Sequence, residues 1–94
     1  MKHCILAKWN ETVTDKAALL AQVRALYAAA DAIPGVCGVT VHPCCIDRPN
    51  RYDLMIVLDV DKEALPNWDA SGLHHRWKDE YGGLLEKKAI FDYE

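Results

Sequence analysis

The stretch that decides the fold is Tyr52-Asp53-Leu54-Met55-Ile56-Val57-Leu58. It follows a turn-rich segment, contains neither glycine nor proline, and is rich in large apolar side chains, which predicts a strand. Successive side chains of a strand point to opposite faces of its sheet. Here both faces are apolar, with Leu54, Ile56 and Leu58 on one and Met55 and Val57 on the other.

Three further segments have the length and composition of strands. They are residues 2–9, residues 36–42 and residues 88–93. Between the first two, large apolar residues recur at helical spacing after Thr14, which is the expected N-cap. This helix is expected to end at Ile33-Pro34-Gly35, because a proline disfavours helical geometry at the residue before it.

A second helical region begins at Asp61, is bent or restarted at Pro66, and resumes after Ser71, a second expected N-cap. Gly82-Gly83 ends it. The element order is therefore β-α-β-β-α-β. This order predicts an α+β domain of the ferredoxin-like type, in which a four-stranded antiparallel sheet carries helices on one face. Residues 1–94 are enough for one such domain and too few for two.

The sheet face without helices is the basis for a predicted homodimer. In the first strand, His3 and every second residue after it point one way and should face the helices. The opposite face would be too apolar to lie in water, since it carries Leu6, Met55, Val57 and Phe91. Packing two sheets face to face would remove this surface from water, so we expect a homodimer through the open face.

The charge of the chain argues against nucleic acid and membranes as partners. The formal net charge is −3, and there is no basic cluster. Lys8 ends the apolar run at the N-terminus too early for a signal peptide, and no stretch approaches the roughly 20 apolar residues of a membrane span. We therefore expect a cytoplasmic protein with four free thiols, namely Cys4, Cys37, Cys44 and Cys45.

The cluster with the most metal-ligand character is His42-x-Cys44-Cys45, which Cys37 could join. Its spacing matches none of the usual zinc patterns. The chain also has no glycine-rich phosphate loop, nucleophile elbow or serine triad. No metal and no cofactor are therefore expected. Asp92 is expected to be solvated or to pair with Lys88.

Five segments of the chain, in this order and at this spacing, resemble the stress-responsive A/B barrel (Dabb) family. They are Lys2–Trp9, Ile33–Val36, Tyr52–Val57, Leu73–Trp77 and Phe91–Tyr93. The resemblance covers essentially the whole chain and implies a dimeric α/β barrel of two Dabb-like domains. It leaves the function open, because the family includes stress-response proteins and a plant polyketide cyclase. The wider superfamily includes monooxygenases, haem-degrading enzymes, isomerases and dehalogenases.

Two histidines are the candidates for catalysis. His74 falls near the third position of the helix that Ser71 caps, where the helix N-terminus disfavours the imidazolium and keeps the side chain able to accept a proton. The resemblance to the cyclase implies that His74 is the general base and His3 the second polar group. Trp68 and Leu54 depart from that enzyme, because they stand where a tyrosine and a polar residue would be expected. A structural role for either histidine is the alternative.

An apolar pocket is expected between the helices and the sheet, with a small molecule as its ligand. Trp68 and Trp77 are large residues for so short a chain, and they favour a slot for a flat ligand. The alternative is that these side chains only form the core, which is the commoner meaning of apolar residues at helical spacing. The residues assigned to the pocket are Val23, Leu26, Tyr27, Leu54, Ile56, Trp68 and Trp77.

Three functions are compatible with this pattern. The leading hypothesis is a cofactor-free lyase, cyclase or isomerase that abstracts a proton next to the carbonyl of an aromatic or polyketide-like compound. The second is a non-catalytic stress-response module that binds a ligand in the same pocket. The third is a cofactor-independent monooxygenase of the wider superfamily. Convergence of His3 and His74 on one deep pocket would favour the first hypothesis.

Overall fold

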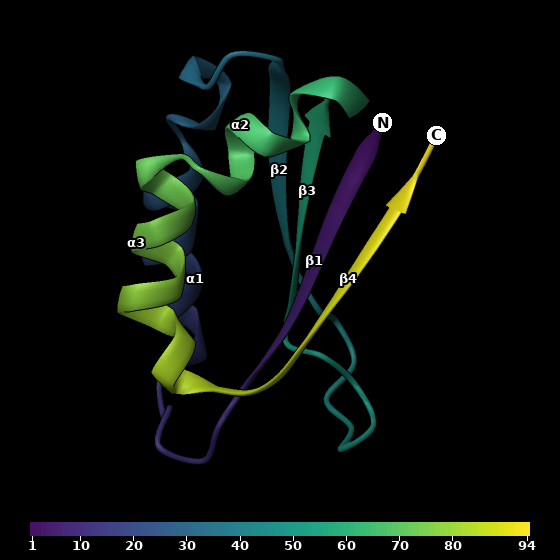
Figure 1. The fold of residues 1–94 in the computed structure, drawn as a ribbon. Coiled ribbons are helices and arrows are strands. Elements are labelled where there is room, and N and C mark those ends of the chain that lie inside the picture. The colour runs from purple at the N-terminus through teal and green to yellow at the C-terminus, as the bar shows by residue number, and fades with distance from the viewer.

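The structure, a computed structural model, describes residues 1–94 and confirms the predicted order of strands and helices. Short 3₁₀ turns at Ala30–Ala32, Lys62–Ala64 and Gly82–Leu84 precede β2, α2 and β4. Figure 1 shows the helices stacked against one side of the sheet. The main elements are β1 (Lys2–Trp9), α1 (Lys16–Tyr27), β2 (Val36–Pro43), β3 (Leu54–Val60), α2 (Leu65–Asp69), α3 (Gly72–Tyr81) and β4 (Leu85–Tyr93).

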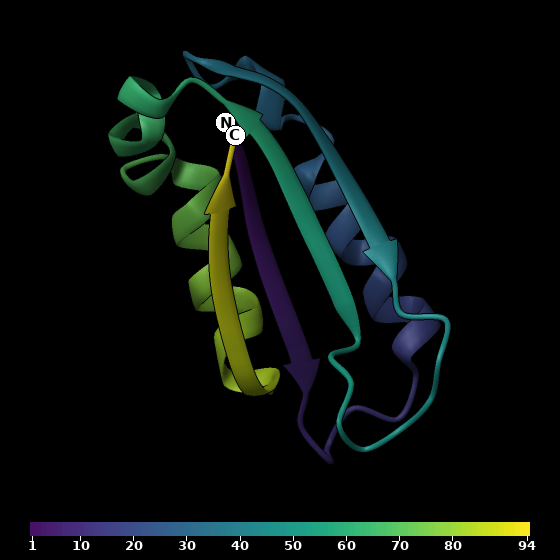
Figure 2. The same cartoon turned by 90° about the vertical axis from the view of Figure 1, so that its right-hand side faces the viewer.

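The four strands form one antiparallel sheet in the order β2-β3-β1-β4. β1 pairs with β3 on one side and with β4 on the other, so the first and last strands of the chain are neighbours. Figure 2 looks onto the side of the sheet that the helices leave open. This arrangement is the ferredoxin-like fold that the element order predicts.

The core lies between the helices and the sheet. The apolar helix-facing residues of β1 and β3 belong to one buried cluster of 15 residues, as the alternation along these strands predicts. Four aromatic rings form the helical side of this cluster: Tyr27 from α1, Trp68 from α2, and Trp77 and Tyr81 from α3. Burying rings of this size stabilises a small domain, at about 25 cal/mol per Å² of apolar surface.

Both ends of α1 differ from the sequence-based prediction. The N-cap is Asp15 rather than Thr14, because the Asp15 carboxylate accepts a hydrogen bond from the Ala18 amide at 3.0 Å. The helix ends at Tyr27, well before Pro34, and the chain tightens into a 3₁₀ turn instead of continuing as α-helix. Such turns commonly satisfy the last carbonyl groups of a helix.

Gly35 joins this turn to β2 with a backbone conformation that only glycine adopts easily. Its φ angle is +90°, and a Cβ atom at this position would lie 2.1 Å from Cβ of Ala64. The Gly35 carbonyl also accepts a hydrogen bond from the Asp61 amide at 2.9 Å. The start of β2 and the 3₁₀ turn after β3 can therefore approach closely.

The open face of the sheet is apolar, as predicted. Cys4 lies opposite Val57 on one neighbouring strand and opposite Phe91 on the other. Phe91 is 64% exposed and Tyr93 is 49% exposed, although both are large and apolar. All four cysteines are free thiols, and of these only Cys4 is buried. None of the helices is both long enough and apolar enough to span a membrane.

Candidate functional site

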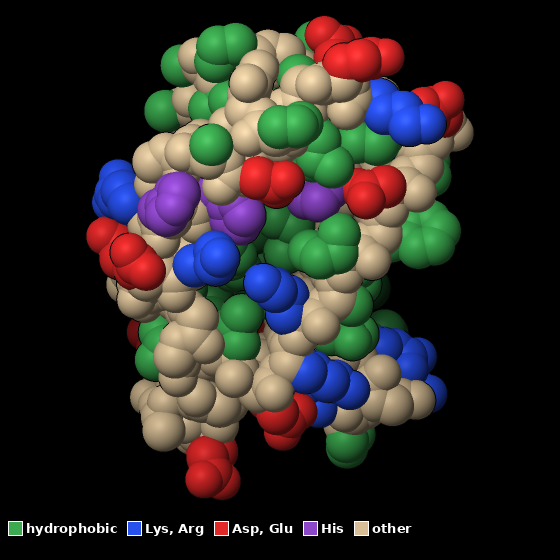
Figure 3. Space-filling model, in the orientation of Figure 1, with side chains coloured by type: hydrophobic (Ala, Val, Ile, Leu, Met, Phe, Trp, Pro, Cys, Tyr) green, Lys and Arg blue, Asp and Glu red, His purple; other side chains and the backbone are tan.

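A cleft of about 340 Å³ opens between the α2–α3 side of the helical layer and the β4 edge of the sheet. Figure 3 shows histidine side chains beside acidic and basic ones around this hollow. The sheet contributes its helix-facing side chains, and the helices contribute theirs from the opposite wall. The lining residues used below are His3, Trp68, Asp69, His74, Trp77, Lys78, Lys88 and Asp92.

His3 is held in the floor of the cleft by Asp92. The two residues lie directly opposite each other on β1 and β4, and His3 is 6% exposed. Because a carboxylate can only accept, the Nδ1–H of His3 donates a hydrogen bond to Asp92 Oδ1. In this tautomer Nε2 is the acceptor atom of the ring.

Asp92 is partly exposed, as one of the two expectations has it, but it does not pair with Lys88. Both residues lie on β4 and point to the helical side, but four residues along a strand span about 13 Å. The carboxylate instead reaches the imidazole of His3 on the neighbouring strand. Asp92 is a site residue that the sequence analysis did not assign.

His74 lies on the opposite wall, at the third residue of α3. The predicted cap is confirmed, since Ser71 Oγ accepts a hydrogen bond from the His74 amide at 3.1 Å. The His74 Nδ1–H donates to the Asp69 carbonyl at 3.1 Å, so Nε2 again carries the lone pair. Burial lowers the pKa of His74 below its ordinary value, and this outweighs the opposing effect of the Asp69 hydrogen bond. His74 is therefore neutral at pH 7.

The two tryptophans do not form an open slot for a flat ligand. Trp68 is 1% exposed and Trp77 is 2% exposed. The ring of Tyr27 lies 5.7 Å from that of Trp68 and 5.8 Å from that of Trp77, and the imidazole of His74 stacks on Trp68. Protein rings thus pack against both indoles, so the tryptophans are core residues rather than the walls of an open slot.

The structure brings together four of the residues assigned to the site and separates the other five. His3, His74, Trp68 and Trp77 line the cleft. Val23, Leu26, Tyr27 and Ile56 are core residues instead, because α1 packs directly on the central strands and leaves no space there. Leu54 faces a different hollow at the far end of the sheet. Asp69, Lys78 and Lys88 also line the cleft, but the sequence-based prediction does not include them. Alternation along β4 indicates the position of Lys88, because Lys88 points to the same face as Ile90.

Tyr27 has a buried hydroxyl group with no hydrogen-bond partner within the chain. Its ring is fully buried between the two tryptophans that line the cleft. Burial raises the pKa of Tyr27 above its ordinary value, so the side chain is neutral at all physiological pH values. An unsatisfied hydroxyl in the core lowers stability, which makes Tyr27 a notable exception in this fold.

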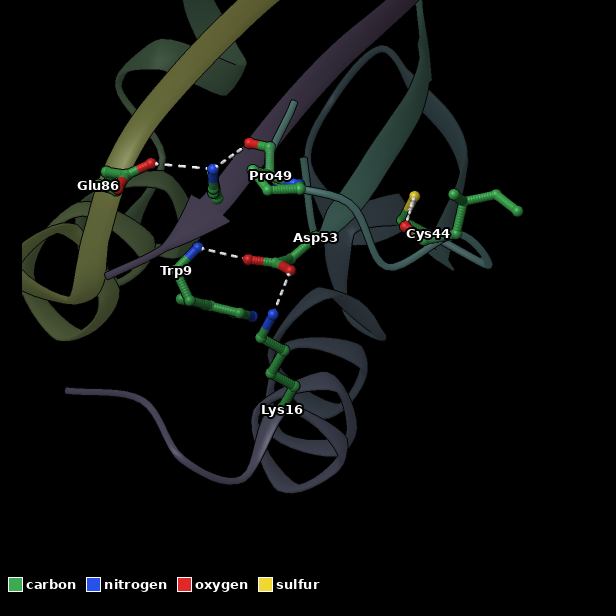
Figure 4. A network of polar contacts seen from close by, with 8 residues as sticks. Trp9, Lys16, Cys44, Pro49, Asp53 and Glu86 are labelled. Carbon is green, nitrogen blue, oxygen red and sulfur yellow. Dashed lines mark hydrogen bonds and ion pairs between the residues drawn. The ribbon is translucent and has the colours of Figure 1, made fainter. Parts of the chain in front are cut away.

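A second hollow, of about 640 Å³, lies under the β2–β3 loop at the other end of the sheet. Its charged groups hold the loop in place (Figure 4). Asp53 accepts hydrogen bonds from the Trp9 amide and from Lys16 Nζ, each at 2.8 Å. Lys8 Nζ donates to the Pro49 carbonyl at 2.6 Å and pairs with Glu86 at 3.2 Å. These contacts are structural, so the smaller cleft with the two histidines is the candidate site.

The His42 and cysteine cluster does not form a metal site in this structure. His42 Nε2 lies 2.8 Å from Thr40 Oγ1, and the Cys44 thiol lies 3.3 Å from the Ile46 carbonyl. No group of three histidine, cysteine, aspartate or glutamate side chains is arranged to hold a metal ion.

No protein-family model matches the chain, and no curated protein matches it. Several solved structures are similar in fold. A dimeric ferredoxin-like protein of unknown function from Thermobifida fusca superposes with a TM-score of 0.80 at 19% identity, covering 98% of this chain and 87% of that one. A hydroxynitrile lyase from Passiflora edulis gives 0.75 at 15% identity, covering 98% and 89%. A Dabb family protein from Mesorhizobium loti gives 0.73 at 14% identity, covering 99% and 93%.

These matches confirm the fold that the resemblance implies. The chain has the ferredoxin-like fold found in Dabb and dimeric ferredoxin-like proteins, over nearly its whole length. Some of the similar proteins have no known function, and one is a lyase. The fold alone therefore does not determine the function of this chain.

Proposed function

We propose that the chain is a cofactor-free enzyme that moves protons on a small carbonyl compound, in a lyase, cyclase or isomerase reaction. The observation that supports this most is the convergence of two histidines from opposite layers on one cleft, His74 from α3 and His3 from β1. Each imidazole uses its Nδ1–H in a hydrogen bond within the chain, which leaves both Nε2 atoms for a ligand.

His74 has the properties of a general base. It is neutral at pH 7, and Ser71, Asp69 and Trp68 fix its orientation. Its Nε2 would take a proton from the carbon next to a carbonyl, and the C–H electron pair would form an enolate. Returning the proton to another atom completes an isomerisation. Attack of the enolate carbon on a second carbonyl forms a carbon–carbon bond, and the resulting alkoxide takes the proton back from His74, which completes a cyclisation.

A lyase reaction needs the same groups. His74 would take the proton of a hydroxyl, the carbonyl would form, and the bond to the leaving group would break with its electron pair on that group. Nε2 of His3 would accept this proton from His74 and give it to the leaving group, and the carboxylate of Asp92 would stabilise the imidazolium of His3 in the intervening step. The hydroxynitrile lyase from Passiflora edulis shows that a protein of this fold carries out a lyase reaction.

The volume of the cleft limits the substrate to a small molecule. About 340 Å³ is near the lower end of ligand pockets, and it suits a compound with one aromatic ring. The ring would lie beside Trp68 and Trp77 rather than between the indoles, because Tyr27 packs against both of them.

The stacking of His74 on Trp68 supports a second candidate function, a non-catalytic binding module. A histidine that packs on a buried ring and donates to a backbone carbonyl has the contacts of a structural residue. In that case the cleft would bind a ligand without turning it over. The experiment below separates the two functions.

The functional unit is proposed to be a homodimer through the open sheet face. The exposed side chains of Phe91 and Tyr93, with the half-buried Leu6, Met55 and Val57, form an apolar surface that a second sheet would cover. Solved proteins of the same fold are dimeric. The cleft lies on the helical side, so it would stay open in this dimer.

The test uses two probe reactions and a neighbouring histidine as the control. Proton exchange of acetophenone in D₂O reports proton abstraction next to a carbonyl, and release of benzaldehyde from mandelonitrile reports lyase chemistry. We expect wild-type activity in at least one, a loss of about 10²–10⁴-fold in His74→Ala, and nearly unchanged stability. His75→Ala should remain active, because His75 does not line the cleft.

Two results would contradict the enzyme proposal. One is no rate above buffer for the wild type in either reaction. The other is equal activity of wild type and His74→Ala, combined with a loss of about 1–3 kcal/mol of stability in the variant. Either result would favour the binding module.

A further inference from the structure

Two lysines of the cleft have no partner within the chain. Lys78 from α3 and Lys88 from β4 line it from opposite walls, and both are exposed. The ion pairs of the molecule involve neither of them. Figure 3 shows basic side chains directly beside the histidines at the hollow. Two ammonium groups without an ion-pair partner thus lie at the cleft.

The acidic residues of the cleft form no ion pair with these lysines. The carboxylate of Asp92 is committed to His3. Asp69 remains, and its effect on the pKa of His74 is opposed by both lysines, with Lys78 having the larger influence of the two. Both ammonium groups are therefore free to pair with a negatively charged group of a ligand next to His74.

We propose that Lys78 and Lys88 bind a carboxylate group of the substrate, so that the substrate class is a small oxo- or hydroxycarboxylate. The inference rests on the proposed function for the reacting end of the molecule, which Nε2 of His74 would face. One or two ammonium groups are sufficient for a single carboxylate.

The lysines and His74 would therefore have different roles in the cleft. The ammonium groups would fix one end of the substrate and so orient the carbon or hydroxyl that His74 deprotonates. Because both lysines are exposed, each contact should contribute modestly to affinity, and the preference for an anion should weaken at high salt.

The test compares two probes of nearly the same shape, phenylacetate and phenylacetamide, which differ in charge. Binding to the purified full chain is followed by NMR shifts of the tryptophan indole groups at low salt. We expect phenylacetate to bind about tenfold more tightly than phenylacetamide. Lys78→Gln and Lys88→Gln should each reduce this preference by about threefold, and the double variant should abolish it. Lys62→Gln, on the exposed turn after β3, is the matched control and should keep it.

Equal affinities for the two probes in the wild type would overturn the carboxylate site. So would binding of neither probe at millimolar concentration, or an unchanged preference in the double variant. These failures differ from failure of the proposed function. If the wild type exchanges the protons of neutral acetophenone but does not prefer the anion, the proposed enzyme activity stands and the carboxylate site is wrong. If the wild type prefers the anion but catalyses neither probe reaction, the carboxylate site stands and the proposed enzyme activity is wrong.

Discussion

The imidazole of His74 lies parallel to the indole of Trp68, with ring centroids 5.0 Å apart and ring planes inclined by 10°. The Asp69 carbonyl holds Nδ1 of the same imidazole at 3.1 Å. The ring therefore cannot turn without losing both a hydrogen bond and a stacking contact. A base whose orientation is fixed before the substrate arrives avoids that ordering cost during the reaction.

The pH dependence of activity should reflect the lowered pKa of His74. Since burial moves this pKa below 6.5, the base stays unprotonated into mildly acidic solution. We expect the acid limb of the profile of kcat/KM for acetophenone exchange to have its midpoint below pH 6.5. A midpoint above this value would show that another group is the base.

The same pKa shift predicts how stability depends on pH. Between the folded pKa of His74 and 6.5, the unfolded chain binds more protons than the folded chain, so stability rises with pH. The contribution is complete above pH 6.5 and is lost as the pH falls through the folded pKa. Urea unfolding should show this loss in the wild type and not in His74→Gln. Parallel curves for the two proteins would contradict it.

Asp92→Asn should lower activity more than it lowers stability. The amide oxygen can still accept from Nδ1 of His3, but the negative charge that stabilises the imidazolium is gone. We expect a rate loss of at least about tenfold with a change in unfolding free energy of about 1 kcal/mol, because Asp92 is partly exposed. Asp79→Asn, on the exposed side of α3, is the control. Equal rates for both variants would show that the charge of Asp92 has no role in the reaction.

Strand alternation and helix capping predict where the site residues lie better than side-chain chemistry predicts which residues they contact. His3 was predicted to face the helices because parity along a strand is local, and His74 was placed because Ser71 signals a helix start. The bond between His3 and Asp92 depends on the register of the first and last strands, which no local pattern contains. The closed tryptophan faces depend on Tyr27, which a different helix brings between them.

Tyr27→Phe should stabilise the protein. The hydroxyl of Tyr27 is buried without a partner in the chain, so removing it abolishes a desolvation cost and leaves the ring packing intact. We expect a gain of about 1 kcal/mol in unfolding free energy by urea denaturation. A loss of similar size would mean that the hydroxyl is hydrogen-bonded in solution.

Gly35→Ala should be among the most destabilising small substitutions in the chain. Its φ angle of +90° is unfavourable for alanine, and the added Cβ would lie 2.1 Å from Cβ of Ala64. We expect a loss of about 2 kcal/mol or more in thermal or urea unfolding. Gly38→Ala is the control, because a Cβ there meets no atom within 4 Å. Similar stability of the two variants would contradict the close approach.

Phe91→Lys should convert a dimer into a folded monomer. Phe91 is 64% exposed in the single chain, so the substitution leaves the core untouched. In a face-to-face dimer the same side chain would be buried beside Cys4 and opposite the partner sheet, where an unpaired ammonium group costs several kcal/mol. Ala25→Lys, on the exposed side of α1, is the control and should stay dimeric.

Sedimentation of the wild type and both variants decides this prediction. The wild type and Ala25→Lys should have twice the 10.6 kDa mass of the chain, and Phe91→Lys should have that mass once. Because the cleft lies on the helical side of the sheet, monomeric Phe91→Lys should also keep the anion preference of the wild type. A wild type that sediments as a monomer at micromolar concentration would show that the open face does not pair two copies. A dimer that survives the Phe91→Lys substitution would place the interface elsewhere on the molecule.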